Sequence, residues 1–421
     1  MRNQNSYGNN SANRFIDSPS QRLKAFHAPE EVVTISQETR SKGGDILQLL
    51  SKLKNFITNT ELPLDPSINQ SRSDFIRQYL MKIESIANTT TYSDVRLLNG
   101  ESGVTAEING KGLNFVRGGK NASLYSNDFI PVKVHEMPER SYVKSRLKLT
   151  DSLVSREKYI YLKVNERHFE FDVRNCQTLQ EFSGRYRIYS LHVGLDISFN
   201  LDEDDYGYFY YNQFGENYRF EVLSVNTGIF QDRQKNFMES NQGKNINAKI
   251  GSMPTIGLGN FIVGQSSDNP SDGIVLCYSD VINHPEEEVG MIKLKNNNWV
   301  YRNNDDTFEK ISLPNLKPTE MGVGVYNRSG FKNLMMIHCD NLQQKFDSLL
   351  LLNWSIQDVK YILYKVKKTE HEFAHKSMER LKELKSVWLP ENHQISSISE
   401  AKNVTADLIS KSHFLKTSIS A

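Results

Sequence analysis

The chain has 421 residues, 38% hydrophobic and 24% charged, which is enough for two or three compact units. Its 51 Lys and Arg nearly balance its 50 Asp and Glu, and a formal net charge of +1 does not favour nucleic acid or an anionic membrane as a partner. Apolar runs such as Leu349–Leu352 are far shorter than the roughly 20 residues of a membrane span.

The first residues, MRNQNSYGNNSANRF, are rich in Asn and Ser and contain no hydrophobic core segment. We therefore expect a flexible leader rather than a secretory signal peptide. Cys176, Cys277 and Cys339 are widely spaced and form no CxxC pair. Buried free thiols are thus expected, not a disulfide framework or a cysteine zinc site.

Two amphipathic helices are predicted next, because hydrophobic residues recur at intervals of three and four. The first stripe is Ile46, Leu49, Leu50, Leu53, Phe56 and Ile57, and the second is Phe75, Ile76, Tyr79, Leu80, Ile83 and Ile86. The polar loop between them ends in Ser71-Arg72-Ser73-Asp74, a typical helix N-cap. Two helices joined in this way most simply form an antiparallel hairpin.

The middle of the chain carries the pattern of strands. Apolar and polar residues alternate over 157–173 and over 194–225, with a turn expected at Asp204-Asp205-Tyr206-Gly207 and a short helix around 179–189. Gly, Asn and Pro interrupt the strands that follow, at positions typical of turns. We expect one or two small β-rich domains here, inserted into a helical stem.

Helical periodicity returns in the last ninety residues. Leu349, Leu352, Ile356, Val359, Leu363 and Val366 are spaced 3, 4, 3, 4 and 3 apart, and the same count continues to Glu370 and Phe373. A heptad pattern of this length predicts a long helix packed in a coiled-coil-like bundle.

That helix contains His371-Glu372-Phe373-Ala374-His375, a match to the H-E-x-x-H pattern of zinc proteases. If Phe373 occupies the inward d position, His371, Glu372 and His375 lie at the outward positions b, c and f, respectively. A catalytic zinc also needs a third protein ligand, and no recognisable ligand motif follows. We therefore predict no catalytic residue, cofactor or metal, and keep a zinc metalloprotease using His371, Glu372 and His375 as the less favoured alternative.

Two further stretches allow more than one interpretation. The acids of LDEDDYG (201–207) could bind Ca²⁺, but they lack EF-hand spacing, and a solvated hairpin turn is favoured. The aromatic residues Tyr206, Tyr208, Phe209, Tyr210 and Tyr211 could form a carbohydrate or partner surface, although packing across a sheet is the commoner outcome.

Residues 49–103 resemble the N-terminal stem of bacterial flagellins. In that family a helix, a polar loop and a second helix lead into an I-A-x-T-T-x-[FY]-N-x-x-x-L-L-x-G turn. The matching residues here are Ile86, Ala87, Thr89, Thr90, Tyr92, Leu97, Leu98 and Gly100, with Ser93 in place of the usual Asn. Residues 246–280 resemble a repeat of flagellin variable domains, and 311–337 resemble the segment that re-enters the C-terminal stem.

The resemblance implies an α+β fold: an antiparallel, coiled-coil-like helical bundle from both chain ends, with an inserted β-rich outer domain. The expected segments are a flexible or degenerate N-terminal segment (1–40), an N-terminal helical stem (41–104), a β-rich variable insert (105–330), and a C-terminal helical stem with a terminal helix (331–421). The implied function is a self-assembling structural subunit of the flagellar filament, without catalysis.

By the same resemblance, the partners are other flagellin-type subunits, the flagellar export apparatus and a flagellin chaperone. The implied location is the extracellular flagellum, reached without a cleaved signal peptide. Pro19, Pro29 and Gly43-Gly44 are expected to break the first terminal helix, and Lys411 and Lys416 interrupt the apolar stripe of the last. A minor or hook-filament junction subunit is therefore an alternative, as is a β insert that serves as a binding module.

Overall fold

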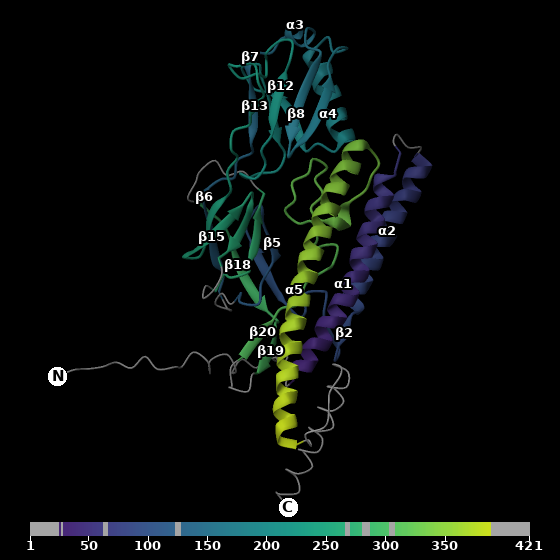
Figure 1. Ribbon diagram of the computed structural model, residues 1–421, viewed down its shortest axis with the longest axis vertical. Coiled ribbons are helices and arrows are strands. Elements are labelled where there is room, and N and C mark those ends of the chain that lie inside the picture. Colours follow the sequence, from purple (N-terminus) through teal and green to yellow (C-terminus); the bar gives the residue numbers. More distant parts are fainter. Residues whose placement is uncertain are drawn as a thin grey trace, which may run out of the picture.

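The computed structural model describes residues 25–26, 28–61, 66–122, 128–265, 270–279, 287–302 and 308–388. The fold is α+β, as predicted, with a large β-sheet portion and several helices (Figure 1). Three clusters of buried hydrophobic residues divide the described chain into what we call the helical, middle and outer domains. The leader and the terminal helix expected around Lys411 and Lys416 lie outside the described residues.

The helical domain is built from α1 (Pro29–Thr58), α2 (Pro66–Thr89) and α5 (Leu342–Trp388). The α1 and α2 helices form a hairpin, and the ring centroids of Phe56 and Phe75 lie 4.1 Å apart. The α5 helix runs antiparallel to α1 (Figure 1): Ser377 donates to Glu30 (2.7 Å) at one end, and Lys345 donates to the Thr60 carbonyl (2.6 Å) at the other. No helix in the described ranges is long and apolar enough to cross a membrane.

The breaks expected at Pro29 and Gly43-Gly44 are wrong, because α1 is continuous from Pro29 to Thr58 and residue 40 falls within it. Pro19 lies outside the described residues. Pro29 is the first helical residue, where its missing N–H costs no hydrogen bond. Gly43 faces α5, and a Cβ on it would lie 2.5 Å from Leu363 Cδ2. Here the glycine allows close helix packing rather than ending the helix.

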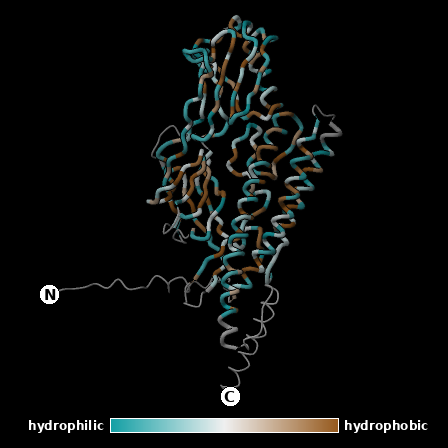
Figure 2. Tube along the Cα trace, viewed as in Figure 1, coloured by the Kyte–Doolittle hydropathy of each residue, from teal (hydrophilic) through white to brown (hydrophobic). Residues whose placement is uncertain are grey.

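The buried seam of α1 has heptad spacing throughout. Its members, spaced alternately four and three apart, are Val32, Ser36, Thr39, Gly43, Ile46, Leu50, Leu53 and Ile57. The first half of this seam is mostly small and polar, and the second half is aliphatic. In Figure 2, hydrophobic and hydrophilic residues alternate along the helices, as expected of helices with one buried side.

The flagellin-like turn after α2 is a short hairpin of β2 (Thr91–Tyr92) and β3 (Val95–Arg96). Its two central residues, Ser93 and Asp94, have φ of +46° and +65°, as a two-residue hairpin turn requires. Leu97 N–H donates to the Thr90 carbonyl (2.9 Å), and Leu97 and Leu98 are fully buried in the helical domain. The motif therefore ends α2 and returns the chain to the core.

The middle domain is an eight-stranded antiparallel sheet in the order β4-β18-β6-β14-β15-β16-β17-β5. Its strands are β4 (Val104–Asn109), β5 (Leu113–Arg117), β6 (Ile130–Glu136), β14 (Asn247–Ile250), β15 (Met253–Leu258), β16 (Phe261–Gly264), β17 (Val275–Tyr278) and β18 (Glu287–Asn296). It contacts α5 through Phe261, which stacks on Trp354 with ring centroids 5.8 Å apart. A small sheet of β1 (Ala25–Phe26), β19 (Trp299–Arg302) and β20 (Phe308–Ile311) lies farther along α5, where Tyr301 packs against Phe373.

The outer domain is inserted between β6 and β14 and has its own core. Its elements are β7 (Tyr142–Lys148), α3 (Asp151–Val154), β8 (Tyr159–Val164), β9 (Arg167–Asp172), α4 (Leu179–Val193), β10 (Ile197–Leu201), β11 (Tyr206–Tyr211), β12 (Glu221–Ser224) and β13 (Met238–Glu239). They form the sheets β10-β11-β7 and β13-β12-β8-β9. In Figure 1 this domain extends beyond the end of α5 at which that helix begins.

The predicted hairpin turn at 204–207 is shifted, because Tyr206 and Gly207 already belong to β11. Asp202 organises the turn: its Oδ1 accepts the N–H of Asp204 (3.1 Å) and of Tyr206 (2.8 Å). Asp205 takes a positive φ (+65°) in this turn. The three cysteines are buried free thiols, as predicted.

Candidate functional site

The side chains of the H-E-x-x-H motif lie on the exposed side of α5. His371, Glu372 and His375 are exposed, whereas Phe373 is 3% exposed, as the predicted register requires. His375 Nδ1 lies 3.5 Å from Glu379 Oε2, and Glu372 Oε1 lies 3.9 Å from Lys368 Nζ. Over the described ranges, no group of three or more His, Cys, Asp or Glu side chains could hold a metal ion.

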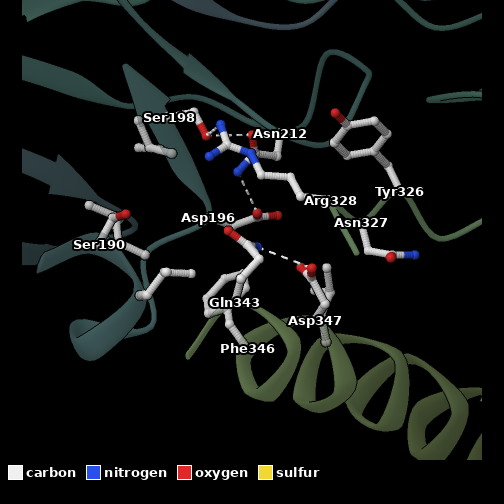
Figure 3. A pocket seen from close by; sticks show the side chains of 14 residues that line it. Ser190, Asp196, Ser198, Asn212, Tyr326, Asn327, Arg328, Gln343, Phe346 and Asp347 are labelled. Carbon is white, nitrogen blue, oxygen red and sulfur yellow. Dashed lines mark hydrogen bonds between the residues drawn. The ribbon is translucent and has the colours of Figure 1, made fainter. Parts of the chain in front are cut away.

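A polar pocket lies where the outer domain meets the beginning of α5 (Figure 3). Four segments supply its lining: the end of α4 together with β10, Asn212 directly after β11, the loop 326–328 that precedes α5, and the first turns of α5. The polar residues among them are Ser190, Asp196, Ser198, Asn212, Tyr326, Asn327, Arg328, Gln343 and Asp347. None of these had been singled out in the sequence.

Asp196 is the buried acid of this pocket. Its carboxylate accepts hydrogen bonds from Asn212 Nδ2 (2.8 Å) and Gln213 Nε2 (3.1 Å). Burial raises the pKa of Asp196 to about 6, since the hydrogen bonds and the Arg328 charge offset only part of the lost solvation. The negative charge of Asp347 acts in the same direction as burial.

Asp347 fixes the loop that precedes α5. Its Oδ2 accepts from the Ser329 N–H (2.8 Å), the Ser329 hydroxyl (2.6 Å) and Gln343 Nε2 (3.1 Å). Arg328 extends from this loop to the outer domain, where it donates to the Ser198 hydroxyl and to Tyr210 Oη (3.3 Å). The loop is therefore tied to α5 on one side and to the outer domain on the other.

Arg140 makes a second link between the same parts. Its guanidinium lies 4.3 Å from the ring centroid of Phe214 and 4.4 Å from that of Tyr326, and its Nε donates to the Asn212 carbonyl (2.9 Å). Gln213 Nε2 also donates to the Tyr326 carbonyl (3.2 Å). Together with the contacts of Asp196, Arg328 and Asp347 described above, these contacts orient the outer domain on α5, and we call the whole set the polar junction.

The sequence comparisons assign no family. No protein-family model matches the chain, and no curated protein does. The flagellin resemblance therefore depends on the residues quoted for it.

Several solved structures of flagellar proteins match at low identity. The D1-D2-D3 domains of the flagellar cap protein from Escherichia coli match at 11% identity and a TM-score of 0.32, over 53% of this chain and 63% of that one, which is less than two thirds of its length. The cap protein D2-D3 domains from Serratia marcescens match at 9% identity and a TM-score of 0.28, over 46% and 99%. The flagellar junction protein from Legionella pneumophila matches at 8% identity and a TM-score of 0.26, over 82% and 93%. Such TM-scores establish no shared overall fold, and these matches do not single out flagellin.

Proposed function

We propose that this chain is a structural subunit of a bacterial flagellum, and specifically a flagellin-like subunit that assembles into a filament through its helical domain. The antiparallel pairing of α1 with α5 carries the proposal. Glu30 contacts Ser377, Gly43 faces Leu363, and Thr60 contacts Lys345, so the pairing follows α1 along its length. Helices from distant parts of the chain thus lie together, with β-rich domains inserted between them.

The hairpin that follows α2 supports the same proposal. It is the segment with the most specific resemblance to flagellins, and its residues have defined structural roles: Thr90 Oγ1 donates to the Ile86 carbonyl (2.7 Å), and Leu97 and Leu98 fill the helical core. The turn links α2 to the β-rich part, the position that the flagellin stem gives it.

We propose that neighbouring subunits meet along the exposed sides of the helices. Large apolar side chains are available there: Met81 of α2 is 54% exposed and Tyr364 of α5 is 64% exposed. Contacts between unlike faces of successive copies that do not close into a ring generate a helical filament. The outer domain, which lies beyond the beginning of α5, would then point away from the contacts between subunits.

The remaining partners follow from this proposal. Other flagellin-type subunits are the direct partners, and the flagellar export apparatus and a flagellin chaperone act before assembly. The protein would reach the extracellular flagellum through that apparatus, without a cleaved signal peptide.

Negative-stain microscopy of the purified chain, with and without flagellin filament seeds, tests the proposal. We expect filaments, and we expect Tyr364→Asp to prevent them while the matched Ile188→Asp on α4, 55% exposed in wild type, does not. Protein that remains monomeric with seeds present would refute the filament role. Binding at seed ends without elongation would favour the junction-type alternative instead.

We also propose that the chain is not an enzyme. Metal analysis of the purified protein and a casein digestion assay, each compared with His375→Ala, test this directly. Bound zinc together with proteolysis, both lost in His375→Ala, would refute the proposal and support the protease alternative.

A further inference from the structure

The sheet β10-β11-β7 of the outer domain has two faces of opposite character. Val143, Ile197 and Phe209 point into the hydrophobic core from the three strands. On the other face, the register pairs Tyr210 with Tyr142, and Tyr208 with both Lys144 and Asn200. With Tyr206 these residues form what we call the tyrosine face: Tyr142, Lys144, Asn200, Tyr206, Tyr208 and Tyr210.

The tyrosine face presents aromatic rings at regular intervals. Same-side residues of a strand are about 7 Å apart, and Tyr206, Tyr208 and Tyr210 follow one another in this way along β11. The rings of Tyr208 and Tyr210 have centroids 5.6 Å apart, and Tyr142 on the neighbouring strand is 44% exposed. Phe209 is fully buried in the core, so the alternation in YGYFYY places Tyr206, Tyr208 and Tyr210, each half-buried, on the opposite face.

We propose that the tyrosine face binds neutral polysaccharide chains. Sugar rings combine apolar C–H faces with hydroxyl groups at their edges. Tyrosine suits both parts, since its ring offers an apolar face and its hydroxyl both donates and accepts hydrogen bonds. Asn200 and Lys144 add further polar groups directly beside Tyr208.

The charges of the face favour a neutral ligand. Lys144 Nζ lies 2.6 Å from Asp202 Oδ2, and Lys148 Nζ lies 3.9 Å from Asp204 Oδ1. Polyanions such as nucleic acids bind to Lys and Arg side chains, which neutralise the phosphates and release their counterions. Aspartates balance these two lysines. Arg328 and Arg140, which contact Tyr210, are engaged by the Ser198 hydroxyl and by the rings of Phe214 and Tyr326, so the face offers few free cations to such a ligand.

The composition of the face also disfavours a hydrophobic protein partner. The residues of the tyrosine face are Tyr, Lys and Asn, without an aliphatic side chain. Protein interfaces have a more apolar centre from which charged residues are depleted. A hydrated, hydroxyl-rich ligand matches this surface better.

Native gel electrophoresis of the unpolymerised full chain tests the proposal, with dissolved galactomannan, dextran or hydroxyethyl cellulose in the gel and heparin in a parallel gel. We expect at least one neutral polysaccharide to retard the protein. Tyr208→Ala should weaken that binding at least about tenfold, or ~1.4 kcal/mol, whereas Tyr208→Phe keeps the ring and should retain most of it. Tyr364→Ala, on the exposed side of α5, is the matched control and should bind as wild type.

Tyr142→Ala serves as a second variant, since the exposed Tyr142 side chain can be removed with little effect on folding, which near-ultraviolet circular dichroism will verify. It should also weaken binding. No retardation by any of the three polysaccharides would overturn the proposal, as would retardation unchanged in both variants, or retardation by heparin alone. Self-association that disappears in Tyr208→Ala would identify a second copy as the occupant and overturn it too. Because the assay uses unassembled protein, its result is separate from that of the filament test.

Discussion

Two of the contacts that α5 makes differ in character. Along α1 it packs in a seam in which the aliphatic residues Ile46, Leu50, Leu53 and Ile57 are fully buried. Where it begins, it meets the outer domain through the polar junction, whose central groups are Asp196, Arg328 and Asp347. Apolar burial is favourable at any angle, whereas hydrogen bonds and charges require particular geometry.

The difference suggests a division of roles along one helix. The seam supplies most of the stability of the helical domain, and the polar junction sets the direction in which the outer domain points. Buried charges that are only partly compensated cost free energy, so the junction is the weaker contact. Four predictions test this comparison, beginning with the largest expected effect.

Leu50→Ala should lower the free energy of unfolding of the helical domain by about 2–5 kcal/mol, because it leaves a cavity in a fully buried seam. Urea unfolding followed by tryptophan fluorescence reports on this domain and its contact with the middle domain but not on the outer domain, since Trp299, Trp354 and Trp388 all lie outside the outer domain. Met81→Ala, at a position 54% exposed, is the control and should change stability by less than about 1 kcal/mol. Equal losses in both variants would contradict a seam that dominates stability.

The second prediction concerns pH and the polar junction. The pKa of Asp196 is about 6 in the folded chain against an ordinary value of 3.8, so the folded state holds the proton more tightly. The unfolding free energy of the outer domain should therefore rise as pH falls from 7 to 4, by up to about 3 kcal/mol from this group. Urea unfolding followed by near-ultraviolet circular dichroism in wild type and Asp196→Asn isolates the effect, because other groups cancel in the difference. A difference that is flat across this range would contradict the prediction.

The two contacts also differ in how far sequence could predict them. The α5 side of the seam was predictable from the aliphatic heptad Leu349–Val366, and the second half of α1 from Ile46–Ile57. The first half of α1 was missed because Ser36, Thr39 and Gly43 are small, although their spacing continues the heptad. A search for regular spacing of small residues as well as aliphatic ones would have found it.

The polar junction could not be predicted in the same way. Asp196 and Arg328 are 132 positions apart, and isolated polar residues have no periodicity that marks them as neighbours. Their contact depends on the tertiary placement of the outer domain on α5. The tyrosines of β11 are intermediate: alternation identifies two faces of the strand, but not which of them is buried.

The third prediction tests how closely α1 and α5 approach one another. Gly43→Val should lower stability by about 1–3 kcal/mol, because the new side chain meets Leu363 in a packed seam. Valine is a better helix former than glycine, so a loss would report packing and not helix propensity. The double variant Gly43→Val with Leu363→Ala should lose less than the sum of the two single variants, in the same fluorescence assay. Additive losses would show that the two residues do not meet.

The neighbouring glycine provides the smallest effect and a change of the opposite sign. A Cβ at Gly44 would have no atom within 4 Å, so Gly44→Ala should raise stability by about 0.5–1 kcal/mol through helix propensity and a less flexible unfolded chain. Because Gly43 and Gly44 share the same helical backbone, any difference between substitutions at the two positions comes from what each one faces. A gain at Gly44 with a loss at Gly43, seen as opposite shifts of the urea midpoint, would place the close approach of the helices at Gly43. Losses at both positions would instead mean that the backbone near Gly43-Gly44 needs glycine for its own conformation, and that the continuity of α1 costs stability at this point.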